Sequence, residues 1–322
     1  MTPVGTTKLA VIGAGSVGTS VAYAALIRGS AHEIALYDVN TAKVDAEVLD
    51  LAHGTQFTAA STVIGGSDLD VVEGSDVVVI TAGAKQRPGQ TRLELAATNA
   101  RILETLMPGL VERAPNAIYV LVTNPCDVLT VVARRVADLP AERVFGSGTV
   151  LDTSRLRLLL ARRAGVSLSS VHAHIVGEHG DSEFPLWSAA AIGPVPILDW
   201  RSPGSGRAAF RRDELDAIAE EVRTAAYAVI QGKGATNYAI GLSAARTAEA
   251  VLHDERAVLP VSTVLGSTAI AGRSGFGDVA LSVPSVVGAS GAFPLTETPF
   301  SDDEAARLEA SADAIRSSLE QL

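Results

Sequence analysis

The sequence predicts an α/β protein, in which a doubly wound parallel sheet is followed by an α+β region. Two observations support this prediction. In the first part of the chain, short apolar runs alternate with helical stretches, and the first run ends in a glycine-rich turn. After about residue 150, helices alternate instead with strands rich in Val, Thr and Ser, and Gly-rich turns separate them. We therefore expect two domains, residues 1–149 and 150–322.

The elements of the first domain follow one another in a βαβ order. An apolar run at residues 9–13 ends in glycine, an alanine-rich helical stretch covers residues 17–27, and a second strand-like run at 33–38 ends in an acid. The pattern then repeats, with strands predicted at 75–81 and 116–123 and a helix at about 91–106. Near-continuous apolar strands that alternate with helices are typical of a parallel sheet covered on both faces.

The second domain carries different signals. Runs at residues 258–264 and 278–283 predict an antiparallel meander. The last helix is predicted to begin at a capping box formed by Ser301 and Glu304. Its apolar residues step by three and four along one face, which is compatible with packing on the core or with an interface: Leu308, Ala312, Ile315, Leu319 and Leu322.

Composition excludes several classes of protein. The 322 residues include 36 acidic and 26 basic side chains, a formal charge of −10, which argues against a general nucleic-acid binder. No leader-like N-terminus and no apolar run of roughly 18 residues is present, so we expect a soluble, cytoplasmic protein without a membrane segment. The single cysteine, Cys126, excludes an internal disulfide and is expected to be a small buried thiol.

A phosphate-binding loop is predicted at the start of the chain. Gly13, Gly15 and Gly18 form a G-x-G-x-x-G pattern after a strand and before a helix, which is typical of a Rossmann-type dinucleotide site. Asp38 follows twenty residues later at the end of the next strand, where a carboxylate binds ribose hydroxyls and repels a 2′-phosphate. The pair favours NAD over NADP, and a glycine turn without a ligand is the weaker alternative.

A second set of residues has the chemistry of an acid–base site. His179 lies between glycines in a loop, and Asp152 and Arg155 lie about one turn apart on a predicted helix. A buried aspartate can fix the tautomer of a histidine and raise its pKa, and an arginine can bind a carboxylate in a bidentate manner. Spacing alone leaves open whether the three residues meet, and a histidine without a chemical role is the usual alternative.

Together these motifs resemble the L-lactate/malate dehydrogenase family over essentially the whole chain. The resemblance rests on GAGSVG with Asp38, and on the segments at residues 86–92 (QRPGQTR), 122–125 (VTNP), 151–155 (LDTSR) and 177–182 (GEHGDS). It implies an NAD-dependent dehydrogenase of fermentative glycolysis. In that family the residues matching His179, Asp152 and Arg155 exchange the proton, orient the histidine and anchor the substrate carboxylate.

The resemblance also implies roles for further residues. Arg92 is expected to lie on a loop that closes over the substrate and to polarise its carbonyl, and Asn124 to hold substrate and histidine near the nicotinamide. Thr236 matches a threonine of the substrate pocket, while Val17 and Asn124 are expected to contact the cofactor. The alternative for Arg92 and Arg155 is that they are solvated helix charges.

Substrate choice is predicted to depend on Gln86. Malate-specific relatives carry arginine at the matching position, because the second carboxylate of oxaloacetate needs a counter-charge. Neutral Gln86 therefore favours pyruvate and L-lactate, with malate or another 2-hydroxy acid as the alternative. The neighbouring Arg87 would take that position if the match were displaced by one residue.

The resemblance further implies regulation and assembly. Arg157 and His172 match a basic pair that binds fructose 1,6-bisphosphate between subunits of bacterial relatives, and a homotetramer is expected. The alternative is an exposed helix arginine and an ordinary strand histidine.

Two alternative functions outside this enzyme class are less favoured. An NAD-using glycoside hydrolase needs a metal site with cysteine and histidine, and the histidines show no metal-binding spacing, so we predict no metal. A non-catalytic NAD sensor is expected to lack His179 or Arg155, and both are present.

Overall fold

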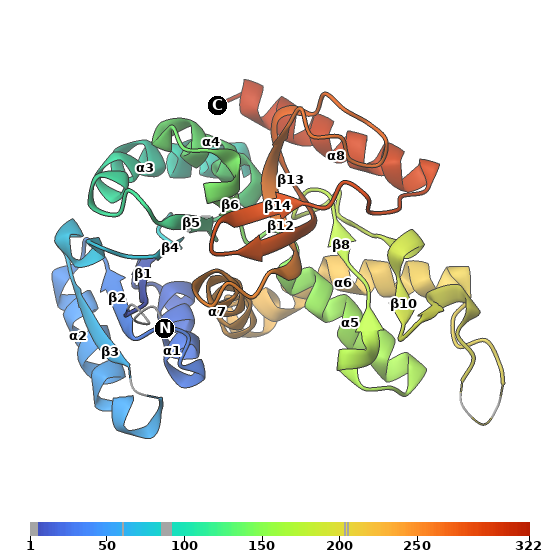
Figure 1. Ribbon diagram of the computed structural model, residues 1–322, viewed down its shortest axis with the longest axis horizontal. Coiled ribbons are helices and arrows are strands. Elements are labelled where there is room, and N and C mark those ends of the chain that lie inside the picture. The colour runs from blue at the N-terminus through green and yellow to red at the C-terminus, as the bar shows by residue number, and fades with distance from the viewer. Residues whose placement is uncertain (1–5, 60, 85–91, 203, 205) are drawn as a thin grey trace, which may run out of the picture.

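The computed structural model describes residues 6–322 apart from residues 60, 85–91, 203 and 205, and it describes Arg92 by its backbone alone. A nine-stranded sheet forms the centre of the described chain, in the order β14-β13-β12-β6-β5-β4-β1-β2-β3. Helices cover this sheet (Figure 1). The predicted fold class is confirmed.

Six strands make the parallel part of this sheet. They are β1 (Lys8–Ile12), β2 (Glu33–Tyr37), β3 (Thr62–Gly66), β4 (Val77–Ile80), β5 (Ile118–Leu121) and β6 (Val144–Gly146). Successive side chains point to opposite faces, so both faces present apolar residues to helices. One face is packed by α1 (Ser16–Arg28), α2 (Thr41–His53) and α7 (Tyr238–Leu252), and the other by α3 (Arg92–Arg113) and α4 (Cys126–Ala137).

The predicted meander is present and extends the parallel sheet. It consists of the antiparallel strands β12 (Ala257–Gly266), β13 (Gly277–Gly288) and β14 (Gly291–Pro294). Strand β12 pairs antiparallel with β6 through Ser262 and Gly146. The chain after residue 150 therefore contributes to the same sheet as the chain before it, and the proposed division at residues 149 and 150 stays a prediction.

The remaining elements surround this sheet. The helices are α5 (Val150–Ala164), α6 (Arg212–Lys233) and α8 (Asp302–Glu320), and the strands are β7 (Val171–His172), β8 (Ile175–Val176), β9 (Phe184–Pro185), β10 (Ala191–Ile192) and β11 (Val195–Pro196). Short 3₁₀ helices lie at Thr55–Phe57, Leu69–Val72, Ala141–Arg143, Leu168–Ser170, Trp187–Ala189 and Ile197–Asp199. Among the described helices, none combines the length and apolarity that crossing a bilayer requires.

The capping box predicted for the last helix is confirmed. The Glu304 N–H donates to Ser301 Oγ at 3.3 Å, and the Ser301 N–H donates to Glu304 Oε2 at 2.8 Å. Its predicted apolar face is buried at Leu308, Ala312 and Ile315. Leu322 was wrongly included in this face: α8 ends at Glu320, and Leu322 lies beyond the helix with 44% of its surface exposed.

The turn between β1 and α1 requires glycine for two different steric reasons. Gly13 has φ +104°, a left-handed conformation that other residues avoid. A Cβ on Gly18 would lie 1.8 Å from the Gly13 carbonyl oxygen and 2.7 Å from Thr81 Oγ1. A Cβ on Gly15 would meet no atom within 4 Å. Gly18 therefore packs the helix on the strand, while the space beside Gly15 is open.

This difference predicts unequal effects of two alanine substitutions. We expect Gly18→Ala to lower the free energy of unfolding by about 3 kcal/mol, because backbone must move to admit the methyl group. Gly15→Ala is the matched control and should cost less than about 1 kcal/mol, since its methyl meets open space and the change is only to a poorer helix cap. Urea and thermal unfolding of both variants measure this, and equal losses would contradict the packing argument.

Candidate active site

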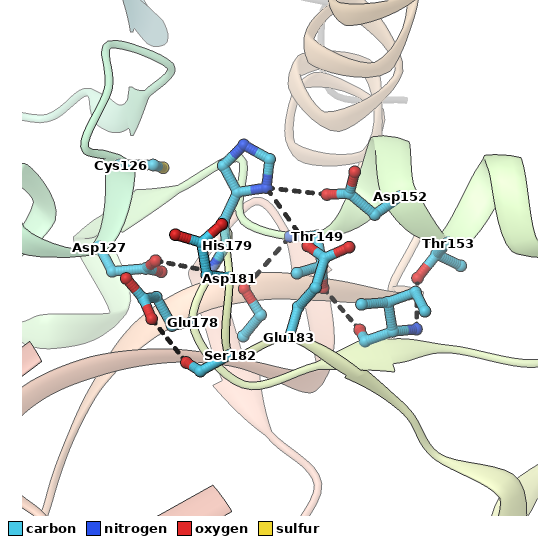
Figure 2. Close-up of polar contacts among 12 residues, drawn as sticks. Cys126, Asp127, Thr149, Asp152, Thr153, Glu178, His179, Asp181, Ser182 and Glu183 are labelled. Carbon is cyan, nitrogen blue, oxygen red and sulfur yellow. Dashed lines mark hydrogen bonds and ion pairs between the residues drawn. The ribbon is translucent and has the colours of Figure 1, made fainter. Parts of the chain in front are cut away.

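His179 lies in the loop that joins β8 to β9, and Figure 2 shows it facing α5. The two strands pair through Val176 and Phe184, so the intervening residues form a tight turn. Gly177 (φ +95°) and Gly180 (φ +155°) supply the backbone conformations that this turn needs. The turn presents the imidazole to a pocket, with 27% of the side chain exposed.

Asp152 holds the imidazole from the first turn of α5. Its Oδ2 lies 2.8 Å from His179 Nδ1, and the residue is only 2% exposed. An acceptor at Nδ1 fixes the neutral tautomer with its proton there, which leaves Nε2 as the ring atom that exchanges a proton. Burial lowers the pKa of His179, but the charge and hydrogen bond of Asp152, with the charges of Glu183 and Asp127, raise it to about 9.

The start of α5 is fixed to β8 by both backbone groups of Ile175. Thr149 Oγ1 donates to the Ile175 carbonyl at 2.6 Å, and the Ile175 N–H donates to Thr153 Oγ1 at 2.8 Å. Thr149 precedes Asp152 by three residues and Thr153 follows it directly, and Figure 2 shows the three side chains. The aspartate and the histidine therefore lie on elements that are directly bonded to each other.

Arg155 extends the same polar chain. Its Nη1 donates to Asp152 Oδ1 at 2.5 Å, so one carboxylate binds the imidazole and the guanidinium with its two oxygens. These two partners lower the pKa of Asp152, although burial opposes the shift. The structure thus places His179, Asp152 and Arg155 in contact, which their spacing in the sequence could not establish. Beyond the Nη1 group that bonds to Asp152, the guanidinium carries N–H groups that can bind a ligand carboxylate.

These residues line a pocket of about 530 Å³ together with Asn124, which follows β5. The Asn124 carbonyl accepts a hydrogen bond from Asn99 Nδ2 at 2.8 Å. Leu93, Leu95 and Ala96 from the first turn of α3 also line the pocket, so the backbone of Arg92 begins the helix at its edge.

Not all predicted site residues belong to this pocket. Thr236 is half-buried between α6 and α7 and is not part of the lining formed by the described residues. Gln86 and the alternative Arg87 lie outside the described residues, as does the side chain of Arg92.

Two buried acids next to His179 were missed from the sequence. Asp127, 2% exposed, accepts the His179 backbone N–H at 2.8 Å on one oxygen and the Ser262 hydroxyl at 2.5 Å on the other. Burial raises the pKa of Asp127 to about 6. Glu183, 5% exposed, places Oε2 3.8 Å from His179 Nδ1. Their types and positions gave no local signal, because their burial arises from tertiary packing.

The group formed by Asp152, His179 and Glu183 also has a spacing that could hold a divalent cation. One ligand atom from each residue lies within 4.8 Å of the others. In this structure Nδ1 is engaged with Asp152, so metal binding would have to replace that hydrogen bond. The prediction of no metal is therefore still untested.

The residues predicted to hold NAD fit that cofactor. Gly15 caps α1 without a side-chain hydrogen bond, and the helix begins at Ser16 with Val17 in its first turn, so its first N–H groups can face a pyrophosphate. Asp38 lies at the end of β2, and its Oδ2 accepts the N–H of Ala14 in the loop at 2.7 Å. This bond places the carboxylate beside the loop, where it can also accept ribose hydroxyls.

The basic pair predicted as an effector site lies on adjacent elements, α5 and β7. Arg157 is half-buried, its Nε donates to the Ala173 carbonyl at 2.9 Å, and its Nη2 lies 3.0 Å from His174 Nε2. His172 is exposed. Burial, with the charges of Arg157 and His172, lowers the pKa of His174 to about 4, so its neutral ring accepts the bond.

Cys126 at the start of α4 is buried, and the prediction of a small buried thiol is confirmed. Burial raises the pKa of this thiol to about 12, so it stays protonated at neutral pH.

Comparisons with known proteins agree with this geometry. Residues 7–146 match the family model described as lactate/malate dehydrogenase, NAD binding domain, and residues 149–322 match lactate/malate dehydrogenase, alpha/beta C-terminal domain. An L-lactate dehydrogenase of Bifidobacterium animalis subsp. lactis is 47% identical over 319 residues, covering 99% of this chain and 98% of the relative. An L-lactate dehydrogenase of Kosmotoga olearia is 43% identical over 315 residues, covering 98% of this chain and 96% of the relative.

A solved structure shares the fold over nearly its whole length. The minor L-lactate dehydrogenase of Enterococcus mundtii, in a ligands-bound form, superposes with a TM-score of 0.92 at 36% identity and covers 98% of each chain. The chain therefore belongs to the lactate/malate dehydrogenase family, and the prediction of an NAD-dependent L-lactate dehydrogenase is confirmed.

Proposed function

We propose that the chain interconverts pyruvate and L-lactate with His179 as the group that gives and takes the proton. The observation that carries this proposal is the chain of contacts from Arg155 through Asp152 to His179 along one pocket. NAD supplies the hydride acceptor and donor of this reaction. The printed names of the curated relatives support the choice of substrate.

In the direction of reduction, the protonated imidazole donates its Nε2 proton to the carbonyl oxygen of pyruvate. Asp152 stabilises the imidazolium before the transfer and keeps the ring in orientation after it. Because the pKa of His179 is raised to about 9, the ring is charged at neutral pH and ready to donate. In lactate oxidation the neutral ring accepts the proton instead, so alkaline pH favours that direction.

Substrate binding is assigned to residues around this pair. Arg155 binds the carboxylate with N–H groups other than the one that bonds to Asp152, and Asn124, which also lines the pocket, contacts the substrate and the cofactor. We assign carbonyl polarisation to Arg92, whose helix begins at the pocket edge, and a place on the pocket wall to Thr236. Water exclusion by the segment that precedes Arg92 would strengthen these charged contacts.

Cofactor binding is assigned to the loop Gly13, Gly15, Val17 and Gly18 with Asp38. The open space beside Gly15 and the uncapped N-terminus of α1 support a pyrophosphate there. Asp38 supports NAD rather than NADP, because its charge would repel a 2′-phosphate.

We further propose a homotetramer that acts in the cytoplasm. Large apolar side chains are exposed on or next to the two helices α1 and α2, which pack on the same face of the parallel sheet: Tyr23 and Ile27 on α1, Leu49 on α2, and Phe57 just after α2. Of the thirteen residues of α2, all described, Val44 alone is fully buried. Such a helix supports burial against a second copy.

We also propose that fructose 1,6-bisphosphate activates the enzyme at Arg157 and His172. The proximity of α5 to β7 supports one shared anion site, and a two-fold axis would double its charge. Arg157 would have to exchange its bond to His174 for one to phosphate.

The role of Asp152 predicts a change in the pH dependence of the reaction. We expect Asp152→Asn to lower kcat/KM for pyruvate by about 10²-fold or more, because an amide does not stabilise the imidazolium. The alkaline fall of pyruvate reduction should also move from near pH 9 to lower pH, since losing the carboxylate lowers the pKa of His179. Initial rates of NADH oxidation between pH 6 and 10 measure both effects. The exposed Asp313→Asn is the control, and an unmoved alkaline limb would argue against the assignment.

The substrate proposal predicts the outcome of a specificity change. Wild-type enzyme should reduce pyruvate faster than oxaloacetate or 2-ketoisocaproate at equal concentration. Gln86→Arg should raise the ratio of oxaloacetate to pyruvate turnover by about tenfold or more, because the new cation pairs with the second carboxylate. Arg87→Gln is the control for the alternative that Arg87, and not Gln86, occupies the specificity position; it should leave the ratio unchanged. If Gln86→Arg leaves that ratio unchanged or lowers it, Gln86 does not determine specificity.

The effector proposal predicts a ligand-dependent saturation curve. Fructose 1,6-bisphosphate should lower the pyruvate concentration needed for half-saturation by about fivefold or more, and Arg157→Gln should abolish this response. The exposed Arg101→Gln should retain it. Sedimentation of the same samples measures the oligomeric state. If the wild-type saturation curves with and without fructose 1,6-bisphosphate superimpose at every pH, the sugar bisphosphate is not an effector.

A further inference from the structure

A second carboxyl group faces His179 in addition to Asp152. His179 and Glu183 lie four residues apart across the turn between β8 and β9, so the hairpin brings their side chains together. Figure 2 shows Glu183 beside the histidine, on the same side as Asp152. Glu183 Oε2 is 3.8 Å from His179 Nδ1, and the glutamate is 5% exposed.

We propose that Glu183 is a positioning residue whose buried carboxyl group, 3.8 Å from the ring nitrogen, keeps His179 protonated in alkaline solution. The inference rests on the proposed role of His179 as the proton donor. It assigns to Glu183 a charge that adds to the one Asp152 already supplies.

The charges around Glu183 explain why it would ionise late. Burial and the charge of Asp152 raise the pKa of Glu183 to about 8, while His179, Arg155 and Arg223 on α6 oppose the rise. Asp152 is the acid that stays ionised, because it bonds directly to both His179 and Arg155. Two carboxylates this close to each other do not both ionise without cost.

A negative charge on Glu183 would help to keep the imidazole of His179 protonated at alkaline pH. Three carboxyl groups raise the pKa of His179: Asp152 from α5, Glu183 from its own hairpin, and Asp127 from α4. The pKa of Glu183 is raised and so is that of His179, and a negative charge 3.8 Å from the ring opposes loss of the imidazole proton. An opposite charge within 4 Å favours the protonated ring by about one pH unit or more.

Distance separates this function from that of Asp152. The 2.8 Å contact of Asp152 fixes the orientation of the ring, whereas 3.8 Å is too long for a hydrogen bond from Glu183. Glu183 therefore acts through its charge alone. Replacement by glutamine keeps the shape of the side chain and removes only that charge.

The test is the pH profile of kcat/KM for pyruvate in the wild type, Glu183→Gln and the exposed control Glu297→Gln. Near pH 6.5, Glu183→Gln should stay within about twofold of the wild type, because the raised pKa of Glu183 leaves its side chain uncharged there, as the glutamine is. Its alkaline limb should fall about one pH unit earlier, which gives about a tenfold deficit at pH 9 and above. Glu297→Gln should follow the wild type throughout.

Glu183→Asp provides a second variant, since it keeps the acid but withdraws it by one methylene group. Its alkaline limb should lie between those of the wild type and Glu183→Gln. If Glu183→Gln does not fold, as judged by its melting temperature, an earlier alkaline limb in Glu183→Asp decides the question.

Two results would overturn the inference: a Glu183→Gln profile that superimposes on the wild type, or a loss of the same size at every pH, which marks a purely structural role. Failure of the proposed function gives a different result. In that case wild-type enzyme would not oxidise NADH with pyruvate, or Asp152→Asn would retain wild-type activity.

Discussion

The hydrogen bond between Asp152 and His179 Nδ1 is the contact on which the site depends. It joins a helix start to a hairpin loop, and four further hydrogen bonds keep it in place: that of Arg155 to the other carboxylate oxygen, that of the histidine backbone N–H to Asp127, and those of Thr149 and Thr153 to β8. The imidazole is thus held through its ring and through its backbone. Three buried carboxyl groups around one imidazole favour the charged ring, which pyruvate reduction requires.

The continuous sheet explains how residues far apart in the sequence meet at this contact. Strand β12, from the last third of the chain, pairs with β6 of the parallel part, and its Ser262 donates to Asp127 on α4. The Thr149 N–H at the start of α5 donates to the β12 carbonyl of Pro260 at 3.2 Å. The two sequence halves therefore share one sheet, and the pocket lies beside their junction.

Local signals in the sequence predicted much of this arrangement. The glycine turn, the capping box of α8 and the helical turn that joins Asp152 to Arg155 depend on neighbours within a few residues, and the structure shows these local features as expected. Asp38 was predicted from its spacing in a βαβ unit, and it directly follows β2. The contact of Asp127 with His179, the burial of Glu183 and the extension of the parallel sheet by β12 depend on packing between distant segments. The exposure of Leu322 depends on where α8 ends. Periodicity carries no such information. The role of Gln86 stays a prediction because that residue lies outside the described chain.

The pKa of the His179 imidazole, followed by ¹⁵N NMR in wild-type enzyme and in Asp152→Asn, tests the central contact most directly. A His179→Asn sample assigns the resonance. We expect the imidazole of His179 to titrate with a midpoint near pH 9 in the wild type and to carry its proton on Nδ1 in the neutral form. In Asp152→Asn the midpoint should be clearly lower. A wild-type midpoint near 6.5, unchanged by the substitution, would contradict this expectation.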